Sequence, residues 1–133
     1  MEPRSFDVSR ERDAPKYLHG HSLSGEERTI EVTTPTLVAA IKPNCNGCQE
    51  FVNGNLSELN HVNVVLVSAT DGGGEWESAR REILVAPDLL SDLGIRSAPY
   101  YVLLVPSNSS VITEGALMSP AQVASEIERY LDV

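Results

Sequence analysis

Two cysteines separated by two residues are the side chains of this sequence whose type and spacing most clearly allow chemistry. They belong to the motif Cys45-Asn46-Gly47-Cys48. Thiols three residues apart lie about one helical turn from each other, close enough to close a small disulfide ring. The motif stands between an apolar segment of strand length, residues 36–41, and a segment typical of a helix start, residues 49–52.

The position of the pair predicts which sulfur reacts. At a strand-to-helix turn the first sulfur lies where the unpaired N–H groups of the helix point outward, and these groups and the helix dipole favour a thiolate. The thiolate is the species that attacks disulfides. We therefore expect Cys45 to be the nucleophile and Cys48, more buried, to be the resolving thiol. Lys42 would favour the thiolate and Glu50 would oppose it, and the sequence does not decide between them.

The elements expected around the pair follow from hydrophobic periodicity and from helix-capping and turn signals. We predict strands at residues 28–33, 36–41, 63–69, 100–105 and 111–113, and helices at 51–59, 75–84, 87–93 and from the capping box at 119–122 to about residue 131. Gly54 is expected to weaken or bend the first of these helices. The order predicts an α/β fold in which a mixed central sheet is flanked by helices.

Composition limits the classes of partner. The 133 residues are 41% hydrophobic and are expected to form one domain, and the net charge of −9 argues against a nucleic-acid or anionic-membrane partner. The apolar runs are too short to span a membrane. Because the N-terminus has no apolar stretch typical of a secretory signal, we expect a cytoplasmic protein, or an exported one whose leader has been removed.

Together with the strand and helix order, three motifs resemble the thioredoxin superfamily over roughly residues 29–132. They are the Cys-x-x-Cys motif, Ser97-Ala98-Pro99-Tyr100-Tyr101 at the start of a buried strand, and Gly115 before the last helix. The resemblance implies a thioredoxin-like fold in which the peptide bond before Pro99 is cis and lies beside the two cysteines. It also implies that the backbone there pairs with the substrate, so Ala98, Pro99 and Asn44 are the expected substrate-binding residues.

Two further features are similar to the TlpA- and ResA-like branch of that superfamily. One is the lead-in, which we assign as an N-terminal extension at residues 1–28 ahead of a thioredoxin-like domain at 29–133. The other is the helix expected at 75–84, which would be inserted before Pro99. The resemblance implies a thiol–disulfide oxidoreductase acting on protein or small-molecule disulfides together with an unknown redox partner. We expect it to be a monomer that needs no cofactor.

Departures from the family pattern support one alternative, and two histidines suggest another. Asn44 stands where thioredoxins proper usually carry tryptophan, residues 37–41 lack their buried aspartate, and Asn46-Gly47 replaces their Gly-Pro pair. The chain would then be an interaction module that docks a partner at Pro99 without redox turnover. In the other alternative, His19 and His21 join the cysteines in a zinc or copper site, although the same histidines fit a solvated hairpin.

Overall fold

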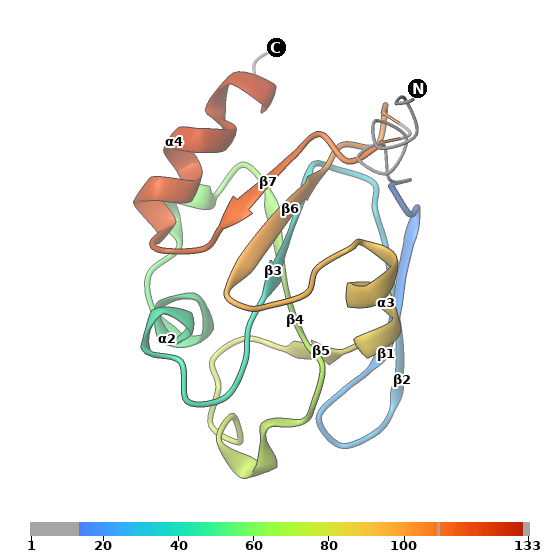
Figure 1. Ribbon diagram of the computed structural model, residues 1–133, viewed down its shortest axis with the longest axis vertical. Helices are drawn as coiled ribbons and strands as arrows, with labels where there is room; N and C mark the ends of the chain where they lie inside the picture. The colour runs from blue at the N-terminus through green and yellow to red at the C-terminus, as the bar shows by residue number, and fades with distance from the viewer. Residues whose placement is uncertain (1–13, 109, 132–133) are drawn as a thin grey trace, which may run out of the picture.

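The computed structural model describes residues 14–108 and 110–131 and shows a seven-stranded mixed sheet with helices on both faces (Figure 1). The strands are β1 (Tyr17–His21), β2 (Glu27–Glu31), β3 (Thr36–Ala40), β4 (Asn63–Ser68), β5 (Ile83–Val85), β6 (Tyr100–Leu104) and β7 (Thr113–Ala116). The helices are α2 (Asn46–Asn53), α3 (Pro87–Asp92) and α4 (Pro120–Leu131), with 3-10 turns η1 (Ser57–Leu59) and η2 (Gly72–Gly74). Of the N-terminal extension assigned to residues 1–28, residues 1–13 lie outside the described residues, and the remainder contains β1 and the start of β2.

Strand β3 is an inner strand of the sheet, whose order is β2-β1-β5-β4-β3-β6-β7. It pairs parallel with β4 and antiparallel with β6, and all five of its residues are buried. Successive side chains of a strand point to opposite faces. Leu37 and Ala39 accordingly pack in the apolar cluster that includes residues of α2 and α4, and Val38 and Ala40 pack with residues of α3. Figure 1 shows these two helix layers on either side of the sheet. The predicted mixed sheet is confirmed.

The helix predicted at residues 75–84 is wrong. The 3-10 turn η2 precedes this segment, which itself forms turns and bends and then strand β5, which pairs parallel with β4. All three residues of β5, Ile83 to Val85, are buried. A short apolar run bounded by polar residues is compatible with either an inner strand or a helix. Here the segment forms a strand, because the backbone of β4 supplies hydrogen-bond partners along its free side. The inserted segment therefore extends the sheet.

Strand β1 was not predicted, and several element boundaries differ from the prediction. Helix α2 ends at Asn53, because Gly54 has an extended backbone and its N–H bonds back to the carbonyl of Glu50 at 2.9 Å. The last strand runs over Thr113–Ala116 and so contains Gly115, which we had placed after it. The predicted capping box is present: the Gln122 N–H donates to Ser119 Oγ at 3.1 Å, and the Ser119 N–H donates to Gln122 Oε1 at 3.2 Å.

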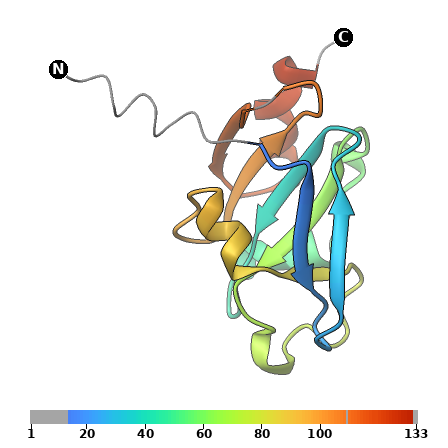
Figure 2. The ribbon, with the colours of Figure 1, turned by 90° about the vertical axis from the view of Figure 1, so that its right-hand side faces the viewer.

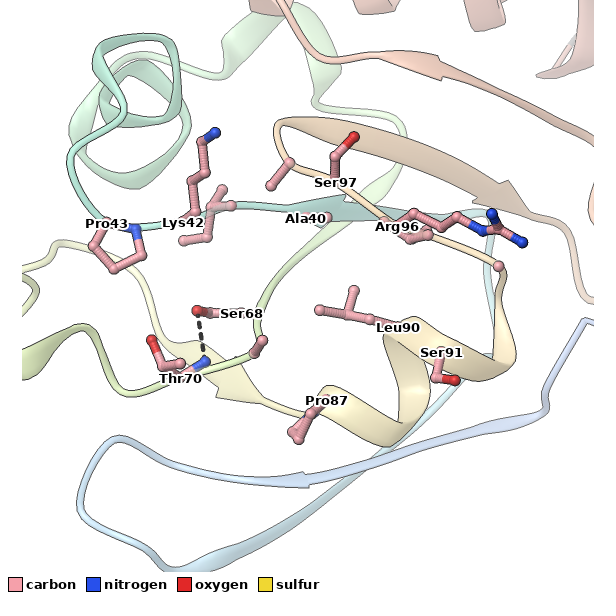
Figure 3. Close-up of a pocket in the computed structure, with 15 residues that line it drawn as sticks. Ala40, Lys42, Pro43, Ser68, Thr70, Pro87, Leu90, Ser91, Arg96 and Ser97 are labelled. Carbon is pink, nitrogen blue, oxygen red and sulfur yellow. Dashed lines mark hydrogen bonds between the residues drawn. The ribbon is translucent and has the colours of Figure 1, made fainter.

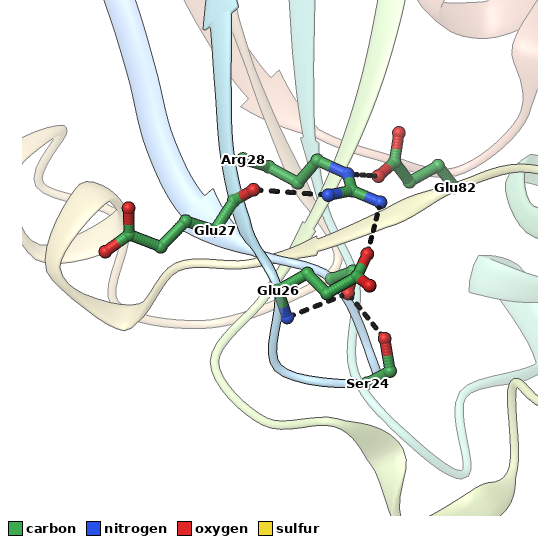
Figure 4. Close-up of polar contacts among 6 residues, drawn as sticks. Ser24, Glu26, Glu27, Arg28 and Glu82 are labelled. Carbon is green, nitrogen blue, oxygen red and sulfur yellow. Dashed lines mark hydrogen bonds and ion pairs between the residues drawn. The ribbon is translucent and has the colours of Figure 1, made fainter.

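The hairpin β1–β2 adds two strands to the open edge of the sheet, as Figure 2 shows. Its buried anchor is Leu18, which pairs with Ile30 across the hairpin. Arg28 ties the hairpin to the chain before β5, since its guanidinium pairs with Glu82 at 2.8 Å and with Glu26 at 3.0 Å (Figure 4). Within residues 14–108 and 110–131, no helix is long and apolar enough to cross a membrane.

Candidate active site

The two cysteines meet at the start of α2 and are bonded as a disulfide, with their Cα atoms 5.3 Å apart. Cys45 is the N-cap residue of α2: its backbone is extended, and its Sγ accepts the Cys48 N–H at 3.2 Å. Cys45 is partly exposed, whereas Cys48 is 0% exposed. The outer sulfur thus takes the place of a capping oxygen at the positive end of a helix. This is the arrangement in which a thiolate on Cys45 would receive helix N–H groups.

Lys42 and Glu50, the two charged residues that the sequence analysis considered, make no described contact with Cys45 or Cys48. Glu50 is the fifth residue of α2, and the first turn of this helix contains no acidic residue, which corrects our placement of Glu50 there. Lys42 is exposed on the loop before the cysteines. Among the described residues, neither side chain forms an ion pair.

Glu75 is the charged residue at the site that the sequence analysis missed. Its carboxylate accepts the backbone N–H of Asn44 at 3.0 and 3.2 Å, one distance for each oxygen, and the side-chain amide of Gln49 at 3.3 Å. The backbone of Asn44 is left-handed, with φ 58°. We had assigned Glu75 to a polar helix, and its only local signal is that it follows the glycine run 72–74. A contact spanning 31 residues leaves no pattern in a single sequence.

The turn at residues 97–99 leads into β6. The peptide bond between Ala98 and Pro99 is cis. Since Ala40 pairs with Tyr100 in the β3–β6 ladder, the turn before Tyr100 lies at the same edge of the sheet as the loop that follows Ala40. The structure therefore brings Ala98 and Pro99 to the sheet edge that also carries Asn44 and the dithiol motif.

A cavity of about 730 Å³ opens beside this turn (Figure 3). Its lining consists of residues 40–43, 68–70 and 94–98 together with Pro87, Leu90 and Ser91. Leu90 and Ala98 contribute apolar surface, and Ser68 Oγ accepts the Thr70 N–H at 3.2 Å. Lys42 lies on the same wall as Pro43, and no acidic residue is among the described lining residues. Neither cysteine is among the described lining residues.

The histidines of the metal alternative lie elsewhere. His19 and His21 are in β1, which β5 and β4 separate from β3, the strand that leads to the cysteines. The His19 ring bonds to Thr29 Oγ1 at 3.1 Å within the β1–β2 hairpin. No group of three or more His, Cys, Asp or Glu side chains able to hold a metal ion occurs in the part of the chain that the structure describes. The structure does not bring these histidines together with the cysteines.

The loop that carries Glu75 depends on a glycine, which allows a stability test. Gly72 has φ +78°, and a Cβ atom there would lie 2.6 Å from Cε3 of Trp76. We expect Gly72→Ala to lower the free energy of unfolding by roughly 2–4 kcal/mol, because the left-handed backbone is strained and the ring is overpacked. Gly73→Ala is the matched control, since Gly73 has φ +60° but open space around it. In urea denaturation, the free energy of unfolding of Gly73→Ala should be only about 1–2 kcal/mol lower than that of the wild type. Equal losses in the two variants would contradict the predicted clash.

Comparison with solved structures identifies the fold of this chain. No protein-family model and no curated protein matches the sequence. Among solved structures, the thioredoxin domain of a thiol-disulfide oxidoreductase from Bacteroides vulgatus is similar with a TM-score of 0.64 at 15% identity, covering 92% of this chain and 98% of that one. The exposed lipoprotein thioredoxin Etrx1 of Streptococcus pneumoniae has a TM-score of 0.61 at 12% identity, with 85% and 98% covered. A secreted disulfide oxidoreductase of Mycobacterium tuberculosis has a TM-score of 0.58 at 15% identity, with 84% and 95% covered. The chain has the thioredoxin fold.

Proposed function

We propose that this protein is a thiol–disulfide oxidoreductase that acts through Cys45 and Cys48. The observation that carries the proposal is the disulfide at the N-terminus of α2, with the partly exposed sulfur as the helix cap. The expected roles of the two cysteines fit this geometry. The names of the solved structures with the same fold, which describe disulfide oxidoreductases, support the same activity.

The reaction runs as two exchanges. The Cys45 thiolate attacks one sulfur of a substrate disulfide, forms a mixed disulfide and releases the other substrate sulfur as a thiolate. The Cys48 thiolate then attacks Cys45 Sγ, closes the Cys45–Cys48 disulfide and releases the second substrate thiol. Two electrons pass from the protein to the substrate, and an external dithiol must return them before the next cycle. With an oxidised protein and a dithiol substrate, the same steps run in reverse.

The substrate chain is proposed to lie along Ala98 and Pro99, facing Asn44. Among the described residues none forms a backbone hydrogen bond with Ala98, so its N–H and C=O are available to an extended substrate strand. A polypeptide bound in this way would place its neighbouring side chains in the cavity beside the turn. Main-chain pairing tolerates many sequences, whereas such a pocket selects among side chains.

An oxidising compartment is the proposed site of action, since disulfide substrates persist there. The sequence left export open as the second reading. The similar structures described as a secreted protein and an exposed lipoprotein support that reading for this chain.

The reduction of insulin by dithiothreitol tests the proposal. We expect catalytic amounts of the protein to accelerate insulin precipitation, because Cys45 would attack the insulin disulfides faster than the free dithiol does. Cys45→Ser should return the rate to that of dithiothreitol alone, and circular dichroism should show that the variant is folded. If the wild-type protein gives no acceleration, the redox proposal fails and the interaction module that docks a partner at Pro99 becomes the better reading.

A further inference from the structure

Glu75 brackets the dithiol motif from a distant part of the chain. Its carboxylate receives the backbone N–H of Asn44, the residue before Cys45, and the side-chain amide of Gln49, the residue after Cys48. One exposed acidic side chain therefore spans both flanks of the four-residue motif. Its partners are a backbone donor and a neutral amide, so these contacts leave its negative charge without a cation.

The neighbour of this glutamate fixes its position. Trp76 is 2% exposed and packs in the apolar cluster that contains Cys48 and Phe51. On the other side, the Asp71 carboxylate accepts the Gly73 N–H at 2.9 Å and closes the turn that precedes Glu75. An exposed glutamate ordinarily loses side-chain entropy when it is held in one place. Here the burial of Trp76 already fixes the backbone at residue 75, so only the side-chain entropy of Glu75 is lost when its carboxylate binds the loop.

We propose that Glu75 is a positioning residue that sets the redox balance of the Cys45–Cys48 couple, an inference that rests on the proposed function. Its hydrogen bonds hold Asn44 in the left-handed conformation, which non-glycine residues seldom adopt. Its nearer carboxylate oxygen lies 3.0 Å from the backbone nitrogen of Asn44, the residue that precedes Cys45, which places its negative charge next to the start of the dithiol motif. A negative charge at this range disfavours a thiolate on Cys45 and so favours the disulfide. The couple is therefore more reducing with Glu75 than without it.

The equilibrium with glutathione tests this balance. The protein dithiol and glutathione disulfide exchange to give the protein disulfide and two molecules of glutathione, and alkylation followed by mass spectrometry measures the oxidised fraction. Glu75→Gln removes the charge and keeps an amide oxygen that accepts the Asn44 N–H. We expect it to lower the equilibrium constant for protein oxidation three- to tenfold, where tenfold corresponds to 29.6 mV. Glu75→Ala should lower it at least as much, since it also releases the loop.

Glu77→Gln is the matched control. Glu77 is exposed in the same segment, and no described hydrogen bond joins its side chain to the dithiol loop. This variant removes the same charge and should change the constant less than 1.5-fold. An unchanged constant in Glu75→Gln, or an equal shift in Glu77→Gln, would overturn the inference. The measurement requires only that the two cysteines exchange with glutathione. A wild-type protein that fails to accelerate insulin reduction would therefore refute the proposed function without deciding this test.

Discussion

Cys48→Ser is expected to stop turnover and to leave the protein covalently attached to its substrate. Cys48 is buried beneath the N-cap sulfur and donates its N–H to Cys45 Sγ, so its own sulfur is the group placed to resolve a mixed disulfide. The chain has two cysteines in all, and no third thiol can replace it. Insulin reduction should therefore fall by about two orders of magnitude or more, as expected when the second half of a covalent cycle is removed.

Non-reducing electrophoresis and mass spectrometry would measure the trapped species. Cys48→Ser, first reduced and then mixed with insulin, should give an adduct through Cys45 that dithiothreitol releases. Cys45→Ser is the matched control, because its remaining thiol is buried and should form little adduct in the folded protein. If Cys45→Ser trapped as much substrate as Cys48→Ser, Cys45 could not be assigned as the nucleophile and Cys48 as the resolving thiol.

The parts of the site that the sequence predicted are those encoded by neighbouring residues. The Cys-x-x-Cys motif and the preceding apolar strand are local signals, because the patterns that predict them span only a few residues. The importance of Pro99 came from its place in a family pattern. Glu75 carries no comparable signal, because its role depends on how the loop after β4 folds back onto the start of α2.

The misassigned segment shows the same limit for the fold. Trp76 and Ile83 are seven residues apart, which is compatible with one face of a helix. In the structure both are buried in one cluster, but the turn around the glycine run brings them there instead of a helical repeat. Periodicity records which residues are buried, and tertiary pairing with β4 decides the backbone that buries them. The mixed sheet was still predicted correctly, because its central strands are long apolar runs.

Trp76→Ala is expected to be strongly destabilising. The indole is 2% exposed and packs in the same cluster as Cys48 and Phe51. Removing a buried aromatic ring typically lowers the free energy of unfolding by about 3–5 kcal/mol, a large share of the roughly 5–15 kcal/mol that holds a domain folded. Trp76→Phe should lose much less, about 1–2 kcal/mol, since it keeps an apolar ring. It also removes a buried indole N–H that has no hydrogen-bond partner among the described residues.

Urea denaturation followed by far-ultraviolet circular dichroism is the suitable measurement, because Trp76 is the only tryptophan and its fluorescence disappears in both variants. Met118→Ala serves as the control: this side chain is 68% exposed, and the variant should stay within about 0.5 kcal/mol of the wild type. Losing the ring should also free Glu75 and shift the glutathione equilibrium in the direction expected for Glu75→Ala. A large loss of stability in Trp76→Ala without that shift would show that the ring supports the core but does not hold the carboxylate on the dithiol loop.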